Sequence, residues 1–318
     1  EGYIPFDQLP KVINPKQGFI STANNKIVDD DYPYHISNTW AQPYRQMRIQ
    51  EFLQEKEKYT VKDLEELQMD QKNLYGKEFT PIFLKELNKA SLNEVEKEGV
   101  NQLTKWNFYD SKDEAAPLIF HLLMKEISNT LFSKEIPKDV MELFEGKSQV
   151  VDELIRKEVA GANSVWFTKY GGFTKVVHTS YENVMKKLQK EYGPDIGEWK
   201  WGDYHQLAFT HPISKSSSML ALLAFNREKP VPIGGSQVTV QAASYGENGI
   251  VNHGASWRFI IDTKDMSNGY HIVGPGQSGH FRSDWYHDQI DDWVNGTYHT
   301  TTLNTEGIEG KVLNLEPK

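Results

Sequence analysis

The sequence predicts an α+β fold in which strand-rich ends surround a helical insertion. Residues 1–45 are rich in Pro, Gly and Asn with short alternating runs, which are typical of strands and ordered loops. Residues 46–160 carry long, charged amphipathic stretches typical of helices. Residues 161–318 are mixed at first and then strand-rich. We therefore expect one antiparallel sheet core built from both ends of the chain, with the helices packed on one side.

Two capping boxes mark helix starts in the insertion. Thr60–Asp63 and Ser91–Glu94 each place a hydroxyl three residues before an acid, so that the two side chains can satisfy the first free N–H groups of a helix. Pro117 fits the first helical turn, where its missing N–H removes no bond. Further helices are expected over 113–134, 139–159 and 180–192.

Two strands are indicated in the last third of the chain. Residues 237–244 and 256–262 alternate apolar and polar side chains, and Gly, Asn or Asp turn signals bound both. These two segments are expected to belong to the sheet.

Composition excludes several classes of partner. The 318 residues carry a formal net charge of -9 with no basic patch, which argues against a nucleic-acid partner because phosphate binding needs clustered Lys and Arg. No apolar run approaches the roughly 20 residues of a membrane span. The absence of Cys excludes disulfides, thiolate metal sites and a cysteine nucleophile, but it leaves the compartment open.

The stretch GFISTANNKIVDDD, residues 18–31, raises the first functional question. Its beginning alternates like a strand and then stops at Asn24 and Asn25. Asn is common in turns and tolerates left-handed backbone, so composition alone favours a turn. The Asn carboxamide also carries two N–H donors that could face a substrate. Both interpretations stay open at this point.

Other chemical signatures are weak or missing. The sequence has no GxSxG elbow, no HExxH, no Walker loop and no well-placed GxGxxG. Asp29–Asp31 offers carboxylates of the kind calcium prefers, but consecutive acids are usually solvated. His280–Asp288 gathers His and Asp side chains without the i, i+4 histidine pair of a helical metal site, and its aromatic neighbours favour a packed surface helix as the ordinary interpretation.

The sequence resembles the β-chain of the penicillin acylases, a family of N-terminal-nucleophile hydrolases. The matching segments run in order over nearly the whole chain: Gly2–Pro10, Asn14–Asn25, Asp31–Pro33, Trp40–Ile49, Gly254–Asp262, Gly276–Gly279 and Trp285–Gln289. The resemblance implies part of an αββα sandwich. It also implies a heterodimer cut from one precursor, with a catalytic serine at the start of the mature β-chain whose own α-amine is the base.

The resemblance also assigns two site residues. Asn24 matches the asparagine whose carboxamide stabilises the tetrahedral oxyanions of acyl transfer, with Asn25 as a structural neighbour. Arg45 matches the arginine that orients the polar groups of the site, a role that suits its permanent charge and rigid fork of donors. The opening question is therefore answered in favour of an oxyanion donor at position 24.

One departure from the family pattern limits what this chain is expected to do alone. It begins with Glu1, without an initiator Met or targeting segment, and the nucleophilic serine is missing. We expect the C-terminal part of an amidase that hydrolyses the side-chain amide of a penicillin or a related acyl amide, inactive by itself. Its implied partners are the α-chain and the N-terminal part of the β-chain.

Further expectations follow from the resemblance. No cofactor is expected within this segment, although the family carries calcium at the chain interface, and export from the cytoplasm is typical of such precursors. Two alternatives remain: a non-catalytic binding or scaffold module that keeps the acylase architecture, and a metal-dependent hydrolase using His280–Asp288.

Overall fold

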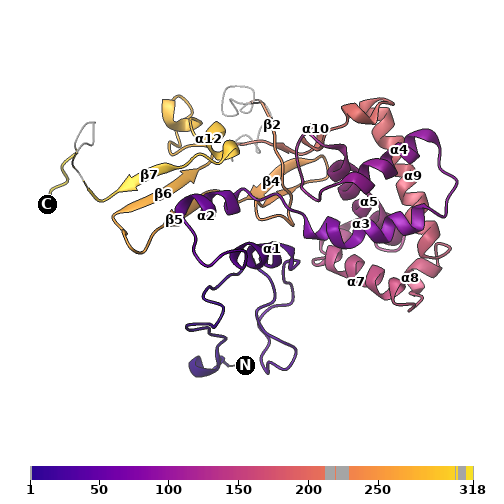
Figure 1. Ribbon diagram of the computed structural model, residues 1–318, viewed down its shortest axis with the longest axis horizontal. Coiled ribbons are helices and arrows are strands. Elements are labelled where there is room, and N and C mark those ends of the chain that lie inside the picture. Colours follow the sequence, from indigo (N-terminus) through magenta and orange to yellow (C-terminus); the bar gives the residue numbers. More distant parts are fainter. Residues whose placement is uncertain (1, 212–218, 220–228, 305, 307–312, 318) are drawn as a thin grey trace.

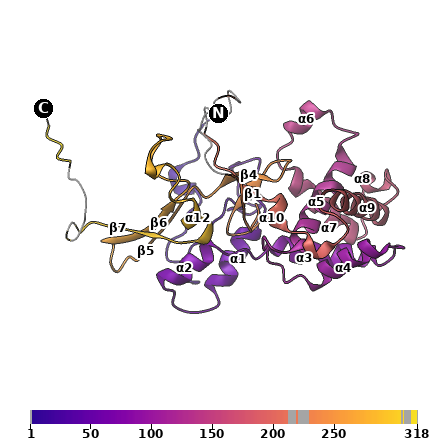
Figure 2. The same cartoon turned by 90° about the horizontal axis from the view of Figure 1, so that it is seen from above.

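The computed structural model describes residues 2–211, 219, 229–304, 306 and 313–317. Helices gather at one end of the molecule and strands at the other, with a second small sheet between them (Figure 1). Viewed from above, β5, β6 and β7 lie far from the helices α3, α5 and α9 (Figure 2). The α+β class predicted from the sequence is therefore confirmed.

The helical region is longer than the predicted insertion. Its helices are α1 (Tyr44–Leu53), α2 (Val61–Gln68), α3 (Leu74–Leu87), α4 (Glu94–Lys105), α5 (Ala115–Phe132), α6 (Lys138–Glu142), α7 (Lys147–Val159), α8 (Val165–Thr168), α9 (Phe173–Tyr192) and α10 (Trp201–Tyr204). Helices thus continue past residue 160 to Tyr204, and the helix expected over 180–192 forms the second part of α9. A further helix, α12 (Ile290–Asn295), lies among the strands, and short 3-10 turns occupy Phe6–Gln8, Ile196–Glu198 and Asp284–Tyr286.

Helix α5 is the centre of the larger core. It packs against α3, α4, α7 and α9, and its apolar side chains are almost completely buried. Pro117 lies in its first turn, as expected. Because α5 is apolar over most of its surface, burial on several sides is the arrangement that removes most of that surface from water.

The local start and stop signals explain most helix boundaries. Thr60 and Asp63 form the predicted capping box of α2. The second prediction is wrong by two residues, because Asn93 and Glu96 form a competing box and α4 begins at Glu94. The single helix expected over 139–159 is divided into α6 and α7. Gly146 lies between them in left-handed conformation, with φ +71°.

Two sheets form from the last third of the chain. The strands are β1 (Gln206–Leu207), β2 (Val231–Pro232), β3 (Ala243–Tyr245), β4 (Ile250–Gly254), β5 (Trp257–Ile261), β6 (Asn268–Val273) and β7 (His299–Thr302). The first sheet has the order β2-β1-β4-β3, in which only β1 and β4 are parallel. The second has the order β5-β6-β7 and is antiparallel throughout.

The predicted strand over 256–262 is confirmed by β5, whereas that over 237–244 is confirmed only at its end. The Thr239 hydroxyl accepts from the Ser236 N–H at 2.8 Å and donates to the Gln241 carbonyl at 3.0 Å. These local side-chain bonds compete with a strand ladder, so residues 237–242 form a loop.

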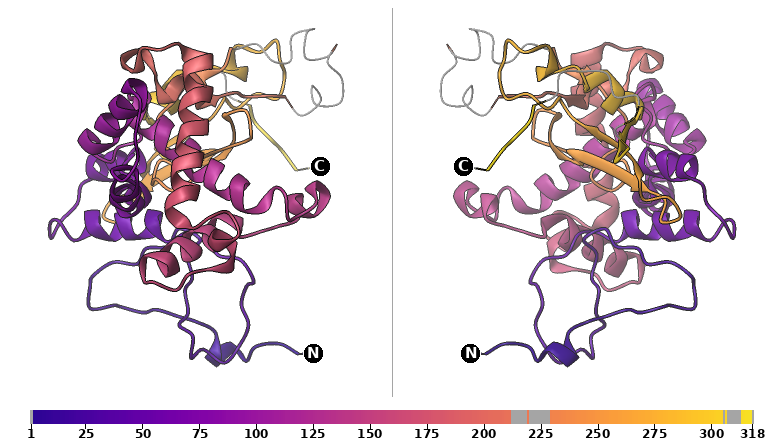
Figure 3. Two further views of the ribbon diagram at one scale, coloured as in Figure 1. Left: turned by 90° about the vertical axis from the view of Figure 1, so that its right-hand side faces the viewer. Right: turned by 90° about the vertical axis from the view of Figure 1, so that its left-hand side faces the viewer.

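The N-terminal segment corrects another expectation. Residues 2–43 contain one 3-10 turn and no strand, and every described strand comes from residues 206–302. Figure 3 shows this segment looping away from the rest of the molecule before α1. Large apolar side chains such as Tyr3, Phe6 and Ile13 are exposed on it. The alternating pattern of the segment therefore has no neighbouring strand with which to pair in this structure.

Within the part of the chain that the structure describes, no helix combines the length and the apolar character needed to cross a bilayer.

A buried acid connects the segment before α1 to the helical core. Asp152 on α7 is 2% exposed and accepts hydrogen bonds from the Tyr75 hydroxyl at 2.7 Å and from the Gln42 amide. Burial raises the pKa of Asp152 from its ordinary value of 3.8 to about 6, against the opposing effect of these two donors.

The first prediction concerns the pH dependence of stability. Because the native carboxyl of Asp152 holds its proton more tightly than the unfolded one, the free energy of unfolding should fall as pH rises from about 4 to about 6. The loss should reach about 3 kcal/mol, to order of magnitude. Asp152→Asn should remove this part of the pH profile in denaturant titrations, while Glu153→Gln on the exposed side of α7 should leave it. Parallel profiles for Asp152→Asn and the parent chain would contradict the assignment.

Candidate active site

The two residues assigned from the sequence lie side by side. Arg45 is in the first turn of α1, and its Nη2 donates to Asn24 Oδ1 at 2.9 Å. A second hydrogen bond holds the segment that carries Asn24: the Ala41 N–H donates to the Asn24 carbonyl at 2.9 Å. Two separate hydrogen bonds thus hold Asn24 against the beginning of α1.

The arginine fixes the orientation of the Asn24 amide. A guanidinium has donors only, so it can bind the oxygen of a carboxamide and not its NH₂ group. The Asn24 Nδ2 is consequently directed away from Arg45 and keeps both of its N–H donors for another acceptor. The backbone at Asn24 is left-handed, with φ +64°, a conformation that Asn tolerates better than most residues.

The neighbouring Asn25 behaves differently. Its Oδ1 accepts from the Ala23 N–H at 3.1 Å, and its Nδ2 donates to the Lys26 carbonyl at 2.9 Å. Both ends of this amide are therefore used in the local turn. The two asparagines therefore differ: the amide of Asn25 is used within the turn, whereas Asn24 Nδ2 forms no hydrogen bond with another described residue.

A cavity of about 340 Å³ opens beside the pair. It is lined by Thr22, Ala23, Asn24, Arg45, Ile49 and Val240. These six residues contribute the Thr22 hydroxyl, the Asn24 amide and the Arg45 guanidinium among otherwise apolar surfaces. They include no carboxylate, imidazole or amine that could take a proton from a hydroxyl. The lining can therefore polarise a carbonyl oxygen, but it contains no activated nucleophile.

The Arg45 side chain is half-buried, and no carboxylate among the described residues pairs with it. Burial lowers the pKa of the Arg45 guanidinium below its ordinary value, and its Nε is a buried donor with no partner among the described residues. A guanidinium remains charged under these conditions because its ordinary pKa lies far above neutral pH. The site therefore holds a positive charge directly behind the carboxamide, and this charge increases the polarity of the Asn24 N–H bonds.

A second arginine of α1 positions the far wall of the cavity. Arg48 is 6% exposed and binds Asp70 through Nε at 3.0 Å and Nη2 at 2.8 Å. The Asp70 carbonyl accepts from the Gln241 N–H at 2.9 Å, and Gln71 Nε2 donates to Gln241 Oε1 at 2.8 Å. These bonds hold the 237–242 loop, and with it Val240, against α1. The sequence predicted a strand over 237–244, so the part of the 237–242 loop that forms a wall of the cavity was not expected.

The possible metal positions do not assemble. Asp30 forms an ion pair with Lys26, and this contact lowers the pKa of the Asp30 carboxyl. In the described ranges, no group of three or more His, Asp or Glu side chains is placed to hold a cation, at Asp29–Asp31 or at His280–Asp288. Among the described residues, neither segment gathers the carboxylates typical of a protein calcium site.

Comparisons with known proteins identify the family. A sequence model of the family described as penicillin amidase matches residues 1–310. The chain is 26% identical to the penicillin acylase 2 proenzyme of Pseudomonas sp., over 92% of this chain and 37% of that protein. It is 23% identical to the acyl-homoserine lactone acylase QuiP of Pseudomonas syringae pv. syringae, over 96% of this chain and 39% of that protein.

A solved structure shows the same fold. The thermostable penicillin G acylase from Alcaligenes faecalis superimposes with a TM-score of 0.62 at 18% identity, covering 99% of this chain and 60% of that one. The present chain belongs to the penicillin amidase family. It spans about two fifths of the length of the curated relatives that it matches.

The second prediction tests the support of the cavity wall. Arg48→Met should lower the free energy of unfolding by about 3–5 kcal/mol, because it leaves the Asp70 carboxylate buried and unpaired. Arg156→Met, at an arginine whose pair with Glu78 is more exposed, should cost about 1 kcal/mol or less. Adding Asp70→Asn to Arg48→Met should recover part of the loss. Equal losses for the two arginine variants in urea titrations would refute the structural role of Arg48.

Proposed function

We propose that this chain supplies the oxyanion donor and its supporting arginine to an amidase that hydrolyses acyl amides. The single observation that carries the proposal is the Arg45 Nη2 to Asn24 Oδ1 hydrogen bond of 2.9 Å at the edge of a cavity. It orients the free N–H donors of Asn24 toward a position where negative charge can develop on a carbonyl oxygen.

The proposed reaction needs a serine and a base from outside the six lining residues. The serine oxygen attacks the amide carbon, its proton passes to the base, and the carbonyl oxygen becomes an oxyanion that receives a hydrogen bond from Asn24. The C–N bond then breaks as the leaving nitrogen takes the proton. Water attacks the acyl-serine through a second oxyanion, releasing the carboxylic acid and restoring the serine.

The substrate class proposed for the whole protein is an acyl amide. The relatives support this class: some are named penicillin acylases, others acyl-homoserine lactone acylases, and both names denote removal of an acyl group. Within this chain, Ile49 and Val240 give the cavity apolar surface beside the Asn24 amide, which suits the acyl part of such a substrate.

The third prediction uses the left-handed backbone of Asn24. In the full-length amidase, Asn24→Gly should lower kcat/KM by roughly 10²–10³ through loss of the oxyanion donor. Thermal stability should be kept, because Gly adopts the φ of +64° without strain. The matched control is Asn163→Gly, at another asparagine of positive φ (+49°), which should leave kcat/KM unchanged. Parental kcat/KM in Asn24→Gly would overturn the proposed role.

The fourth prediction separates the positioning role of Arg45 from direct catalysis. Arg45→Lys keeps the positive charge but loses the rigid fork, so we expect kcat/KM to fall by roughly 10²-fold as the Asn24 amide is misplaced. In the Asn24→Gly background the same change should have little further effect, because Arg45 acts through the missing amide. Fully additive losses in this double-mutant cycle would instead show that Arg45 contacts the substrate itself.

A further inference from the structure

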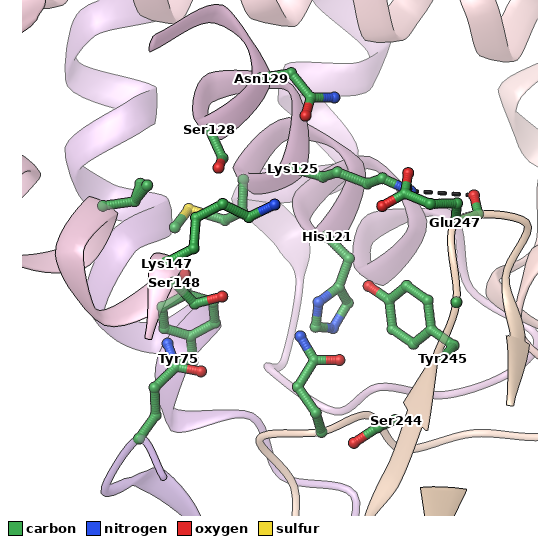
Figure 4. Close-up of a pocket in the computed structure, with 15 residues that line it drawn as sticks. Tyr75, His121, Lys125, Ser128, Asn129, Lys147, Ser148, Ser244, Tyr245 and Glu247 are labelled. Atoms are coloured by element: carbon green, nitrogen blue, oxygen red, sulfur yellow. Dashed lines mark hydrogen bonds and ion pairs between the residues drawn. The ribbon is translucent and has the colours of Figure 1, made fainter. Parts of the chain in front are cut away.

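A second cavity, larger than the one at Asn24, lies beside the central helix α5. It has a volume of about 460 Å³ and is bordered by α5, by the start of α7 and by the turn between β3 and β4 (Figure 4). It shares no lining residue with the cavity at Asn24. Its volume falls in the range of small-molecule sites.

The wall contributed by α5 is polar at helical spacing. His121, Met124, Lys125, Ser128 and Asn129 follow the i, i+3, i+4, i+7, i+8 pattern that places side chains on one face of a helix. The rest of α5 is mostly apolar and buried in the core, apart from Glu126 and Thr130, which form hydrogen bonds with Asn183 and Ser180 of α9. A polar face on the central helix has no packing advantage, so this face points to a polar occupant.

The lining of the cavity carries one more positive than negative charge, because it contains two lysines and one carboxylate, while the Asp110 carboxylate lies behind the lining against His121. The Lys125 ammonium is neutralised by the Glu247 carboxylate at 2.7 Å. The Lys147 ammonium also faces the cavity (Figure 4), and within the described part of the chain it takes part in no ion pair or hydrogen bond. On a chain of net charge -9, a local excess of one positive charge favours a ligand with a single negative charge.

Two hydroxyl groups add unused hydrogen-bond donors. Ser128 Oγ is buried and has no hydrogen-bond partner among the described residues. A buried hydroxyl without a partner costs about 1–3 kcal/mol unless a ligand or a water bonds to it. The Tyr245 hydroxyl points toward the space between His121 and Lys125 (Figure 4). Burial raises the pKa of Tyr245 well above its ordinary value, so this hydroxyl keeps its proton and can donate.

The imidazole in the wall is rigidly held. His121 Nε2 lies 2.9 Å from Asp110 Oδ2, and Asn73 Nδ2 donates to both oxygens of that carboxylate at 2.9 and 3.1 Å. The His121 ring also stacks on Trp201, with the two ring centroids 4.8 Å apart. Asp110 and Asn73 are fully buried. The cavity wall is therefore preorganised, which lowers the entropic cost of binding a ligand.

We propose that this cavity binds a small organic carboxylate. The Lys147 ammonium pairs with the carboxylate, the hydroxyls of Ser128 and Tyr245 donate to its oxygens, and the apolar part of the ligand lies against Tyr75, Met124 and Val151. Lys147, the single lining lysine without an ion pair among the described residues, and the neutral hydroxyl donors suit a monovalent carboxylate better than a phosphate, which needs more positive charge. This inference is independent of the proposed amide hydrolysis.

The test is a calorimetric titration of the full chain with sodium benzoate at constant ionic strength. We expect saturable binding, with Lys147→Gln weakening the affinity roughly tenfold or more and Ser128→Ala about fivefold. Lys157→Gln, which removes an exposed lysine from the same helix, is the matched control and should leave the affinity unchanged. Circular dichroism and thermal unfolding establish that each variant is folded.

Two further probes define the ligand class. Benzyl alcohol, which has the same ring without the charge, should bind at least tenfold more weakly than benzoate, and inorganic phosphate should not compete with benzoate. The proposal is overturned if benzoate does not bind saturably, if Lys147→Gln binds it as well as the control variant, or if benzyl alcohol binds equally well. Competition by phosphate would replace the carboxylate with a general anion site.

Discussion

The buried ion pair between Arg48 and Asp70 holds together the segments that build the Asn24 cavity. Arg48 belongs to α1, one turn after Arg45, and Asp70 follows α2. The Asp70 carbonyl in turn accepts from Gln241, in the loop that carries Val240. A charged pair of this kind tolerates little displacement, because separating it leaves a desolvated charge without a partner. The ion pair therefore fixes the distance between the α1 wall and the loop wall.

Within this frame, Arg45 determines which end of the Asn24 carboxamide is free to bind a ligand. A carboxamide can present either its oxygen or its nitrogen to a neighbour, and an oxyanion site needs the nitrogen. A guanidinium selects the correct orientation because it can bind only the oxygen. The left-handed backbone at Asn24 and the Ala41 hydrogen bond then hold the main chain in place. The Arg45 charge thus sets the orientation of the Asn24 amide, and the backbone at Asn24 sets its position.

The sequence predicted the parts of this arrangement that depend on local or family-specific patterns. The proximity of Asn24 and Arg45 followed from the resemblance, and the cap of α2 and strand β5 followed from residue spacing. The errors occur where local alternatives or distant contacts decide the outcome. Asn93 displaced the expected cap at Ser91, and the Thr239 hydroxyl turned an expected strand into a loop. The Arg48 to Asp70 pair has no local sequence signature, so it could not have been found without coordinates.

Helix α5, at the centre of the core, carries a line of polar side chains beside the second cavity. A core helix gains stability by presenting apolar side chains in most directions, and α5 does so over most of its surface. Along the line from His121 to Asn129 it places a lysine paired with Glu247 and a buried hydroxyl, Ser128 Oγ, that has no partner among the described residues and therefore costs stability. Asp110 and Asn73 nevertheless hold the first residue of the line in a fixed position. Because these polar side chains are held in place although they do not add to the apolar core, ligand binding explains them better than folding stability does.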